Sequence, residues 1–274
     1  MKKQQVQQNQ TVESLVSQPW DAVVVNISGG KDSSALMAWA LDRFPKELLH
    51  FVHAEIDIDW KETLPVVREQ CAFFGVEPIV VCAQAADGSK KGFLSKLTSA
   101  RKDRKTGELK ENQFPNMANR WCTSELKMAP IHKWIRNNLS GRILNLMGER
   151  AEESAQRAKL EKIRFDEKLS AAGREVWNLS AIHELTESQV WEIIHARGIP
   201  VHPCYSWGVK RASCAICIFS SNTDIRLAAK HAPEIAAAYV EAEAKIKHTF
   251  RFKPATSKRG ELKETIATII KGAS

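Results

Sequence analysis

Two groups of residues in this sequence have the types and spacing to carry out chemistry. The first is the run Ser28-Gly29-Gly30-Lys31-Asp32-Ser33, which follows an apolar segment and precedes a helix-like apolar pattern. A strand, a glycine turn and a helix N-terminus together hold phosphate, because free backbone N–H groups and the positive end of the helix dipole point at one spot. Glycine lets the backbone approach the ligand and adopt positive φ. The run lacks the Walker A spacing, which points away from a kinase or a γ-phosphate-cleaving ATPase.

The second group consists of four cysteines. Cys214 and Cys217 form a C-x-x-C pair, Cys204 lies shortly before them, and Cys122 lies far upstream. A lone C-x-x-C pair is a redox pair, half a zinc site or half an iron–sulfur site. Four thiolates complete either a zinc site or a [4Fe–4S] cluster, and their spacing alone does not separate the two.

Composition places the chain among globular proteins with reduced cysteines. It has 274 residues, 43% of them hydrophobic, and a net charge of +8. The first ten residues are polar and Gln-rich, so we expect no signal peptide, and no segment approaches the ~20 apolar residues that span a bilayer. We therefore expect a cytoplasmic protein with no membrane partner. The excess positive charge suits a polyanionic partner such as ATP or nucleic acid.

The elements that must position these residues alternate along the chain. Apolar runs predict buried strands, and patterns with helical periodicity fall between them. The predicted strands cover 22–27, 48–54, 78–82, 143–147 and 175–179, and the predicted helices cover 33–44, 62–74, 124–139 and 186–198. We expect Thr186 to cap the last helix in a capping box with Gln189. Cys71 and Cys82 fall in apolar patterns, so we expect both to be small core residues.

This alternation predicts an α/β fold, a parallel twisted sheet with helices on both faces and right-handed crossovers. A C-terminal cysteine-containing segment and helices over 228–246 and 261–271 follow the sheet. Residues 84–120 carry many Lys and Arg and are interpreted as a long basic loop with room for a short helix. A phosphate-contacting lid and a solvated insertion both explain that loop.

The glycine run resembles the PP-loop of the ATP pyrophosphatases, which form the adenine nucleotide alpha-hydrolase superfamily. Further segments resemble, in order, motifs of the phosphoadenylylsulfate (PAPS) reductase family. They are Phe114-Pro115, Arg120-Trp121-Cys122-Thr123, Leu126-Lys127, Gly148 to Ser154, Trp177-Asn178-Leu179, Val190-Trp191, Gly198-Ile199-Pro200, and the residues from Tyr205 to Cys217. The resemblance extends from about residue 22 to residue 220.

The departures from that family also carry information. Assimilatory sulfonucleotide reductases use a nucleophilic cysteine near the C-terminus, and no cysteine follows Cys217 here. The adjacent cysteine pair of cluster-containing reductases is also missing, because Thr123 follows Cys122. The arrangement is most similar to DNA-phosphorothioation enzymes of the DndC type. That resemblance implies a [4Fe–4S] cluster on Cys122, Cys204, Cys214 and Cys217, with structural zinc as the alternative.

The resemblance also implies how a nucleotide is bound. ATP with Mg²⁺ would lie on the loop, with Ser28, Gly29, Gly30, Asp32 and Ser33 around the pyrophosphate. Lys31 would offset charge, Asp32 would bind Mg²⁺, and Lys31, Asp32 and Arg150 are the predicted catalytic residues. The segment with Arg150, Glu153, Ser154 and Arg157 would supply the second face of the site. Arg157 has an alternative role as a helix charge paired with Glu153.

Glu55 and Asp57 follow the second predicted strand, where open α/β sheets bind ligands. Each of them has two possible roles, a ribose or metal contact and a solvated loop carboxylate.

The predicted function is that of an ATP pyrophosphatase with an iron–sulfur cluster, working in sulfur transfer to nucleic acid. The alternatives are a sulfonucleotide reductase and a non-catalytic nucleotide-binding subunit. The expected partners are an adenine nucleotide and nucleic acid or a sulfur-carrier or cysteine-desulfurase protein, with a homodimer as one expected assembly. The expected domains are a leader over 1–20, a PP-loop domain with the four cysteines over 21–220, and a basic helical extension over 221–274.

Overall fold

The computed structural model describes residues 11–102, 105–250 and 265–272. Contacts divide the chain into two compact units that interleave in sequence. The first unit comprises 1–54, 62–81 and 131–202, and the second comprises 55–61, 82–130 and 203–274.

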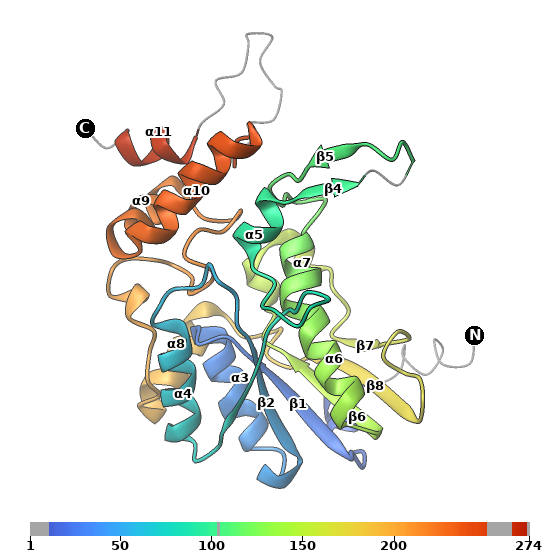
Figure 1. The fold of residues 1–274 in the computed structure, drawn as a ribbon. Coiled ribbons are helices and arrows are strands. Elements are labelled where there is room, and N and C mark those ends of the chain that lie inside the picture. Colours follow the sequence, from blue (N-terminus) through green and yellow to red (C-terminus); the bar gives the residue numbers. More distant parts are fainter. Residues whose placement is uncertain (1–10, 103–104, 251–264, 273–274) are drawn as a thin grey trace. The chain divides into compact units, whose positions relative to one another are not determined.

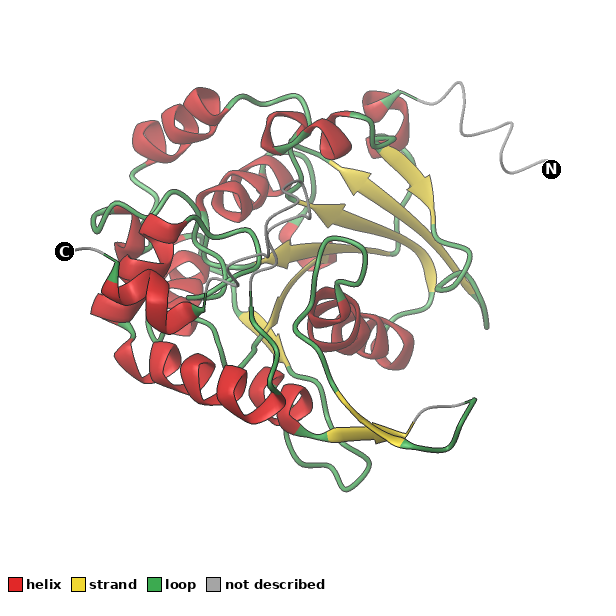
Figure 2. Cartoon of the chain, turned by 90° about the horizontal axis from the view of Figure 1, so that it is seen from above, coloured by secondary structure: helices red, strands yellow, loops and turns green. Residues whose placement is uncertain are grey.

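A six-stranded sheet forms the centre of the first unit. Its strands in chain order are β1 (Ala22–Ile27), β2 (Leu49–Ala54), β3 (Pro78–Val81), β6 (Gly141–Met147), β7 (Ile163–Phe165) and β8 (Arg174–Ser180). Their order across the sheet is β3-β2-β1-β6-β8-β7 (Figure 1), and Figure 2 shows the twist of the strands. All neighbours are parallel except β7, which pairs antiparallel with β8. The predicted α/β fold with a mostly parallel sheet is confirmed, and β7 is an edge strand that the sequence analysis missed.

Helices cover both faces of this sheet. They are α2 (Val12–Val16), α3 (Lys31–Leu41), α4 (Thr63–Phe73), α6 (Ala129–Asn138), α7 (Ala155–Ala158) and α8 (Glu187–Arg197), with 3-10 turns η1 (Lys46–Leu48) and η3 (Ala151–Glu153). Val23 and Val25 of β1 share a core with α3 and α4, whereas Val24 shares one with Ile135 of α6. Alternate side chains of β1 are therefore buried on opposite faces, which explains its continuous apolar sequence.

The predicted boundaries of the helices over 33–44, 62–74 and 186–198 hold to within a few residues, whereas the predicted helix over 124–139 is a π-helix at Cys122–Met128 followed by α6. Helix α8 begins with the predicted capping box of Thr186 and Gln189, and it ends at Gly198, which has φ +66°. Helix α3 begins at Lys31 rather than Ser33, because Gly30 has the extended conformation of an N-cap residue and the helix starts directly after it. The whole Lys-Asp-Ser segment is therefore helical rather than part of the loop.

The second unit is built around an aromatic core. Its elements are α5 (Phe93–Thr98), β4 (Ala100–Lys102), β5 (Leu109–Glu111), the π-helix η2 (Cys122–Met128), the 3-10 turn η4 (Pro203–Tyr205), α9 (Asn222–His231), α10 (Pro233–Ile246) and α11 (Ile266–Lys271). The ring of Phe93 stacks on Trp121 at 5.0 Å and on Tyr239 at 5.5 Å between centroids. These rings join helix α5, the η2 segment and helix α10, so burial of aromatic surface holds the unit together.

The predictions for this unit hold in part. The segment 84–120 contains a short helix, α5, for which the prediction left room, and also the antiparallel β4–β5 pair, which was not predicted. The predicted helix over 228–246 is two helices, because Pro233 lacks a backbone N–H and begins α10 as a first-turn residue. The predicted helix over 261–271 appears from Ile266, and residues 261–264 lie outside the described residues.

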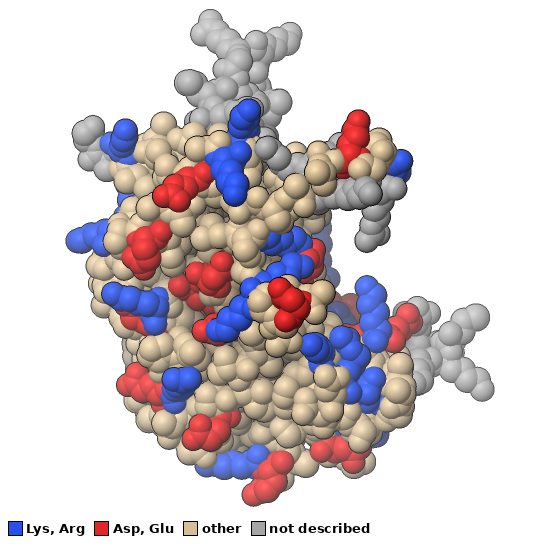
Figure 3. Space-filling model, viewed as in Figure 1, with Lys and Arg blue, Asp and Glu red and all other residues tan. Residues whose placement is uncertain are grey.

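Charged side chains in the basic segment 84–120 are partly neutralised. Lys90 lies 2.7 Å from Glu55, and Lys91 lies 3.1 Å from Glu125, which also pairs with Lys96. Figure 3 shows positive and negative side chains interspersed over the face drawn. In the described ranges, no helix combines the length and the apolar character needed to cross a membrane.

Candidate functional site

The loop between β1 and α3 has the geometry of an anion-binding turn. Gly29 has φ +74°, and a Cβ at this position would lie 3.3 Å from the carbonyl oxygen of Thr63. Ser33 closes the turn, because its Oγ accepts a hydrogen bond from Ser28 N at 3.1 Å and donates one to Gly30 O at 2.8 Å. The loop thus leads directly into the N-terminus of an 11-residue helix, whose first N–H groups lack intrahelical partners.

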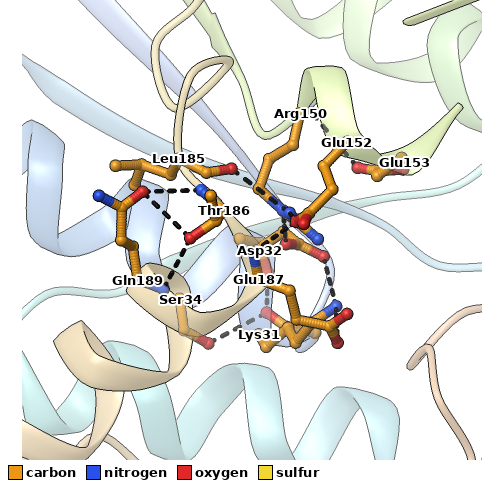
Figure 4. Close-up of polar contacts among 12 residues, drawn as sticks. Lys31, Asp32, Ser34, Arg150, Glu152, Glu153, Leu185, Thr186, Glu187 and Gln189 are labelled. Atoms are coloured by element: carbon orange, nitrogen blue, oxygen red, sulfur yellow. Dashed lines mark hydrogen bonds and ion pairs between the residues drawn. The ribbon is translucent and has the colours of Figure 1, made fainter. Parts of the chain in front are cut away.

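A network of charged side chains surrounds the start of α3 (Figure 4). Arg150 Nε lies 2.5 Å from Asp32 Oδ1, and Lys31 Nζ lies 3.1 Å from Asp32 Oδ2. Lys31 Nζ is also 3.5 Å from Glu187 Oε1. Arg150 Nη1 donates to Glu152 Oε2 at 2.8 Å. The structure therefore brings together all three predicted catalytic residues, and it adds two carboxylates that the sequence analysis did not single out.

The electrostatics of this network depend on Arg150, which is only 3% exposed. Burial alone would lower the pKa of its guanidinium, but Asp32, Glu152 and Glu153 outweigh that effect and raise the pKa above its usual value. The pKa of Glu152 is lowered, first by the hydrogen bond from the backbone N–H of Glu187 and then by Arg150. Arg150 therefore stays a fixed positive charge, suited to a phosphate group.

The segment after Arg150 is organised by its own contacts. The Glu153 carboxylate accepts a hydrogen bond from Arg157 Nη1 at 2.8 Å and from Arg150 N at 3.4 Å. Ser154 is the N-cap of α7 and accepts from Arg157 N at 3.2 Å. The alternative role foreseen for Arg157, an i,i+4 pair with Glu153, is confirmed. Nucleotide contacts by Glu153, Ser154 and Arg157 stay predictions.

Helix α4 braces the loop from one side, a feature that sequence reasoning missed. Gln70 is 1% exposed, and its Nε2 donates to Gly29 O at 3.3 Å and to Pro200 O at 2.9 Å. A Cβ on Gly29 would also meet the Cγ2 atoms of Val67 and Thr63. Thr63, Val67 and Gln70 follow an i, i+4, i+7 spacing, which places them on one helix face. That spacing is the sequence signal that could have identified the brace.

Glu55 and Asp57 have partners within the second unit. Asp57 Oδ1 accepts from Phe93 N at 2.6 Å and Oδ2 accepts from Leu94 N at 3.3 Å, so the carboxylate caps the start of α5. Glu55 accepts from Lys90 Nζ at 2.7 Å. The structure thus gives each carboxylate a local partner, and the ribose or metal contact stays one of the two readings proposed for them.

All four predicted cysteine ligands lie in the second unit. Cys122 begins η2, and Cys204 is fully buried in the core that Cys122 and Cys214 pack against. Cys214 faces Asp59 across an isolated antiparallel bridge, and the next residue, Ala215, donates its N–H to Ile58 O at 2.9 Å. The chain segment 55–61 therefore fixes the backbone at the C-x-x-C pair.

Three of these thiols interact electrostatically. Burial raises the pKa of the Cys122 thiol, and Cys217 adds to that rise. Burial also raises the pKa of Cys214, with Lys127 opposing the shift and Asp59 and Cys217 reinforcing it. Burial and then these same three thiols raise the pKa of Tyr239, whose hydroxyl donates to Ile216 O at 2.9 Å.

Lys127 provides positive charge to this group, and Asp59 lies 3.7 Å from it. Burial alone would lower the pKa of Lys127, but Asp59, Cys214 and Cys217 outweigh burial and raise it. A cation of this kind stabilises thiolates, which are the form that binds metals.

The donor chemistry of the four thiols fits zinc or an iron–sulfur cluster. As the side chains stand, however, no three His, Cys, Asp or Glu residues in the described part of the chain are arranged to hold a metal ion. The same finding applies to Asp32, Glu152 and Glu187. Mg²⁺ commonly uses one or two carboxylates together with substrate phosphates, so Asp32 fits that role only with a nucleotide bound. Both metal assignments stay predictions.

The two remaining cysteines differ from each other. Cys71 is fully buried, as expected, and burial followed by the charge of Glu77 raises the pKa of its thiol to about 12. Cys82 is only partly buried, so the expectation of a core residue holds for Cys71 and not fully for Cys82.

A profile of the phosphoadenosine phosphosulfate reductase domain matches residues 22–221. An uncharacterized protein of Methanocaldococcus jannaschii is 24% identical over 197 residues, which make up 71% of this chain and 36% of that protein. The chain thus spans about a third of that relative's length.

Several solved structures are similar at low sequence identity. The phosphoadenylyl-sulfate reductase of Candida auris has 14% identity and a TM-score of 0.45, over 72% of this chain and 82% of that one. The U34-tRNA thiolase NcsA from Methanococcus maripaludis, solved with its [4Fe-4S] cluster, has 14% identity and a TM-score of 0.47, over 98% and 85%. The FMN adenylyltransferase of Candida glabrata has 12% identity and a TM-score of 0.46, over 94% and 75%.

Proposed function

The chain belongs to the phosphoadenosine phosphosulfate reductase domain family, and from that premise we propose that it is an ATP pyrophosphatase. ATP binds the β1–α3 loop and is cleaved to AMP and pyrophosphate while an acceptor is adenylylated. The observation that carries the proposal is the loop itself, a closed glycine turn at a helix N-terminus with Lys31 and Arg150 beside it. Pyrophosphate is the anion that such a turn with two cations suits.

The proposed reaction has two steps. An acceptor oxygen attacks the α-phosphorus, the bond from that phosphorus to the bridging oxygen breaks, and pyrophosphate leaves. A sulfur nucleophile then displaces AMP from the acceptor. Lys31 and Arg150 stabilise the charge that builds up on the leaving group, and Ser28 and Ser33 position it. The charge network binds both cations to carboxylates beforehand, so the ligand's phosphates must compete with Asp32 and Glu152.

The sulfur-handling part of the proposal rests on the cysteines. Cys122, Cys204, Cys214 and Cys217 would hold a [4Fe–4S] cluster, which supplies sulfur or electron chemistry when bound, or else a structural zinc ion. Nucleic acid is the proposed acceptor, with a sulfur-carrier or desulfurase protein as donor. Anaerobic purification followed by iron and zinc analysis separates the two metals. About four iron atoms per chain support the cluster, whereas zinc without iron supports a structural site.

A turnover assay tests the ATP pyrophosphatase. The chain is incubated with ATP and Mg²⁺, with and without tRNA or duplex DNA, and AMP formation is followed. We expect Lys31→Met and Arg150→Met to lower AMP formation at least about tenfold, because each removes a charge at the leaving group. Arg197→Gln is the matched control, because Arg197 pairs with Asp42 on the exposed side of α8. Equal activity in all variants would contradict the assignment of this site.

A sulfonucleotide reductase is the second candidate, because the family takes its name from that activity. No cysteine follows Cys217, so this reaction needs a thiol from another position or another protein. Release of sulfite from phosphoadenylylsulfate in the presence of a thiol reductant would favour this candidate. AMP formation from ATP without sulfite release would favour the pyrophosphatase.

A further inference from the structure

The second unit contains a cavity of about 300 Å³ next to the C-x-x-C pair. Cys214 and Cys217 contribute to its wall, but Cys122 and Cys204 do not. Two of the four predicted metal ligands are therefore also wall residues of this cavity.

The wall of this cavity is rich in hydrogen-bond donors and positive charge. Lys210 and Arg211 bring two cations, whereas the hydroxyls of Ser213 and Ser221 donate to Cys214 O and Asp224 Oδ2. Ser221 is also the N-cap of α9, a ten-residue helix, so the positive end of a helix dipole lies at the wall. The carboxylate in the wall, Asp224, accepts hydrogen bonds from Ser221 N and Ser221 Oγ at 2.8 Å within the capping box.

An unmet donor also belongs to this wall. Trp60 is 3% exposed and packs edge-on against Trp207 at 5.4 Å between ring centroids. Its indole Nε1 is buried and has no hydrogen-bond partner among the described residues. A buried N–H without a partner costs free energy and commonly marks a site for a water, an ion or a ligand.

We propose that this cavity binds a small tetrahedral oxyanion of the sulfate, thiosulfate or phosphate class. Two cations, a helix N-terminus and the Trp60 N–H supply donors, and an oxyanion supplies only acceptors. The site is separate from the β1–α3 loop, and the proposal does not depend on ATP cleavage.

Equilibrium dialysis of the full chain with radiolabelled thiosulfate under anaerobic conditions tests the proposal. We expect one saturable site per chain. The double variant Lys210→Gln with Arg211→Gln should weaken binding at least about tenfold, and Trp60→Phe should weaken it about fivefold through the lost hydrogen bond. The matched control is Lys230→Gln with Lys245→Gln, which removes two cations of the same unit that are not wall residues.

The outcomes separate cleanly. Competition by sulfate and phosphate, as well as by unlabelled thiosulfate, supports an oxyanion site, whereas competition by neither sulfate nor phosphate contradicts the proposed ligand class. Binding that the cavity variants leave unchanged, or no saturable binding, overturns the proposal. Arg150→Met should leave thiosulfate binding intact, so loss of ATP cleavage can be distinguished from loss of oxyanion binding in the cavity. Circular dichroism of the double variant checks that lost binding is not lost folding.

Discussion

At the scale of single residues, Arg150 is the side chain on which the charge network depends. It is almost completely buried and contacts Asp32 and Glu152 at once. Sequence reasoning identified it only through a resemblance between motifs, because no spacing rule connects residue 150 with residue 32. Glu187, whose carboxylate lies 3.5 Å from Lys31 Nζ, was not predicted at all, since a glutamate in the first turn of a helix is ordinary for reasons of helix dipole alone.

Replacing Arg150 should therefore affect stability as well as activity. Arg150→Met leaves Asp32 with Lys31 as its remaining cation, and we expect the free energy of unfolding to fall by about 2 kcal/mol. Urea denaturation measures this change. Arg197→Met removes an exposed pair and should cost less than about 1 kcal/mol. Similar costs for both variants would mean that the buried network adds no more than a surface contact.

The two cysteines outside the proposed metal site give a second prediction at this scale. Cys71 is fully buried, and its thiol has a pKa raised to about 12, so it stays a protonated thiol at neutral and mildly alkaline pH. Iodoacetamide should label Cys82 in the native protein and should label Cys71 only after unfolding. Peptide mass spectrometry of the native and the unfolded protein measures the labelling of each cysteine. Rapid native labelling of Cys71 would contradict the burial described for α4.

At the scale of elements, helix α4 holds the nucleotide loop in place. Gln70 connects Gly29 with Pro200, so one side chain ties the loop to the turn after α8. Helix periodicity predicted α4 itself, yet it could not show which face meets the loop, because that depends on how the strands pair. The β4–β5 pair was missed for a similar reason: its strands are three residues each and lie within a basic segment.

Gln70→Leu should test the brace. The substitution keeps the volume but removes both donated hydrogen bonds, so the loop loses its fixed position. We expect a reduction of about fivefold to tenfold in kcat/KM for ATP, with the fold retained, and Gln70→Glu should not restore it because a carboxylate cannot donate to two carbonyl oxygens. The control is Gln189→Leu, which removes the N3 side chain of the capping box at the start of α8. Unchanged kinetics in Gln70→Leu would remove Gln70 from any positioning role.

Glu243 makes a pH-dependent connection between the C-terminal helices. Its carboxylate accepts from Phe250 N and Ile266 N, both at 2.8 Å, and it is 7% exposed. Burial raises its pKa, and the two backbone hydrogen bonds oppose the rise only in part. Because the folded state binds the proton more tightly than the unfolded chain, this residue adds stability as the pH falls through the folded pKa.

The sign of that effect can be measured. The unfolding free energy of the wild type minus that of Glu243→Gln should become more positive as the pH is lowered from neutral. This difference should level off below the usual glutamate pKa of about 4.3. Urea unfolding at several pH values provides the comparison, and other titrating groups cancel between the two proteins. A difference that is constant with pH, or that shrinks on acidification, would contradict the raised pKa.

At the scale of the whole molecule, local patterns predicted much more than long-range ones. Apolar runs and the Thr186 capping box gave the strands and helix ends of the sheet unit, because period and capping are local properties. The edge strand β7 was not predicted, because three residues carry no clear alternation. The chain also passes between units several times, through segments such as 55–61, and a linear reading has no signal for such crossings.

The polar core of the sheet was equally hidden from the sequence. Asn26 donates to Asn145 Oδ1 at 2.7 Å, Asn145 donates to Asn178 Oδ1 at 2.7 Å, and Asn178 donates to Asp166 Oδ2 at 3.1 Å. This chain of side chains crosses β1, β6 and β8. It forms only because β1 pairs with β6 and because the β6–β8 register aligns Asn145 with Asn178. Neither the pairing nor the register can be inferred from the sequence of one strand.

We propose that the segment from Ser28 to Ser33 directs cleavage to the α-phosphorus of ATP. The fate of the label tests this when the chain is given Mg²⁺ and ATP labelled at either the α- or the γ-phosphate. We expect the α label in AMP or in an adenylylated acceptor and the γ label in pyrophosphate, in equal amounts. Release of the γ label as free phosphate together with ADP would contradict it.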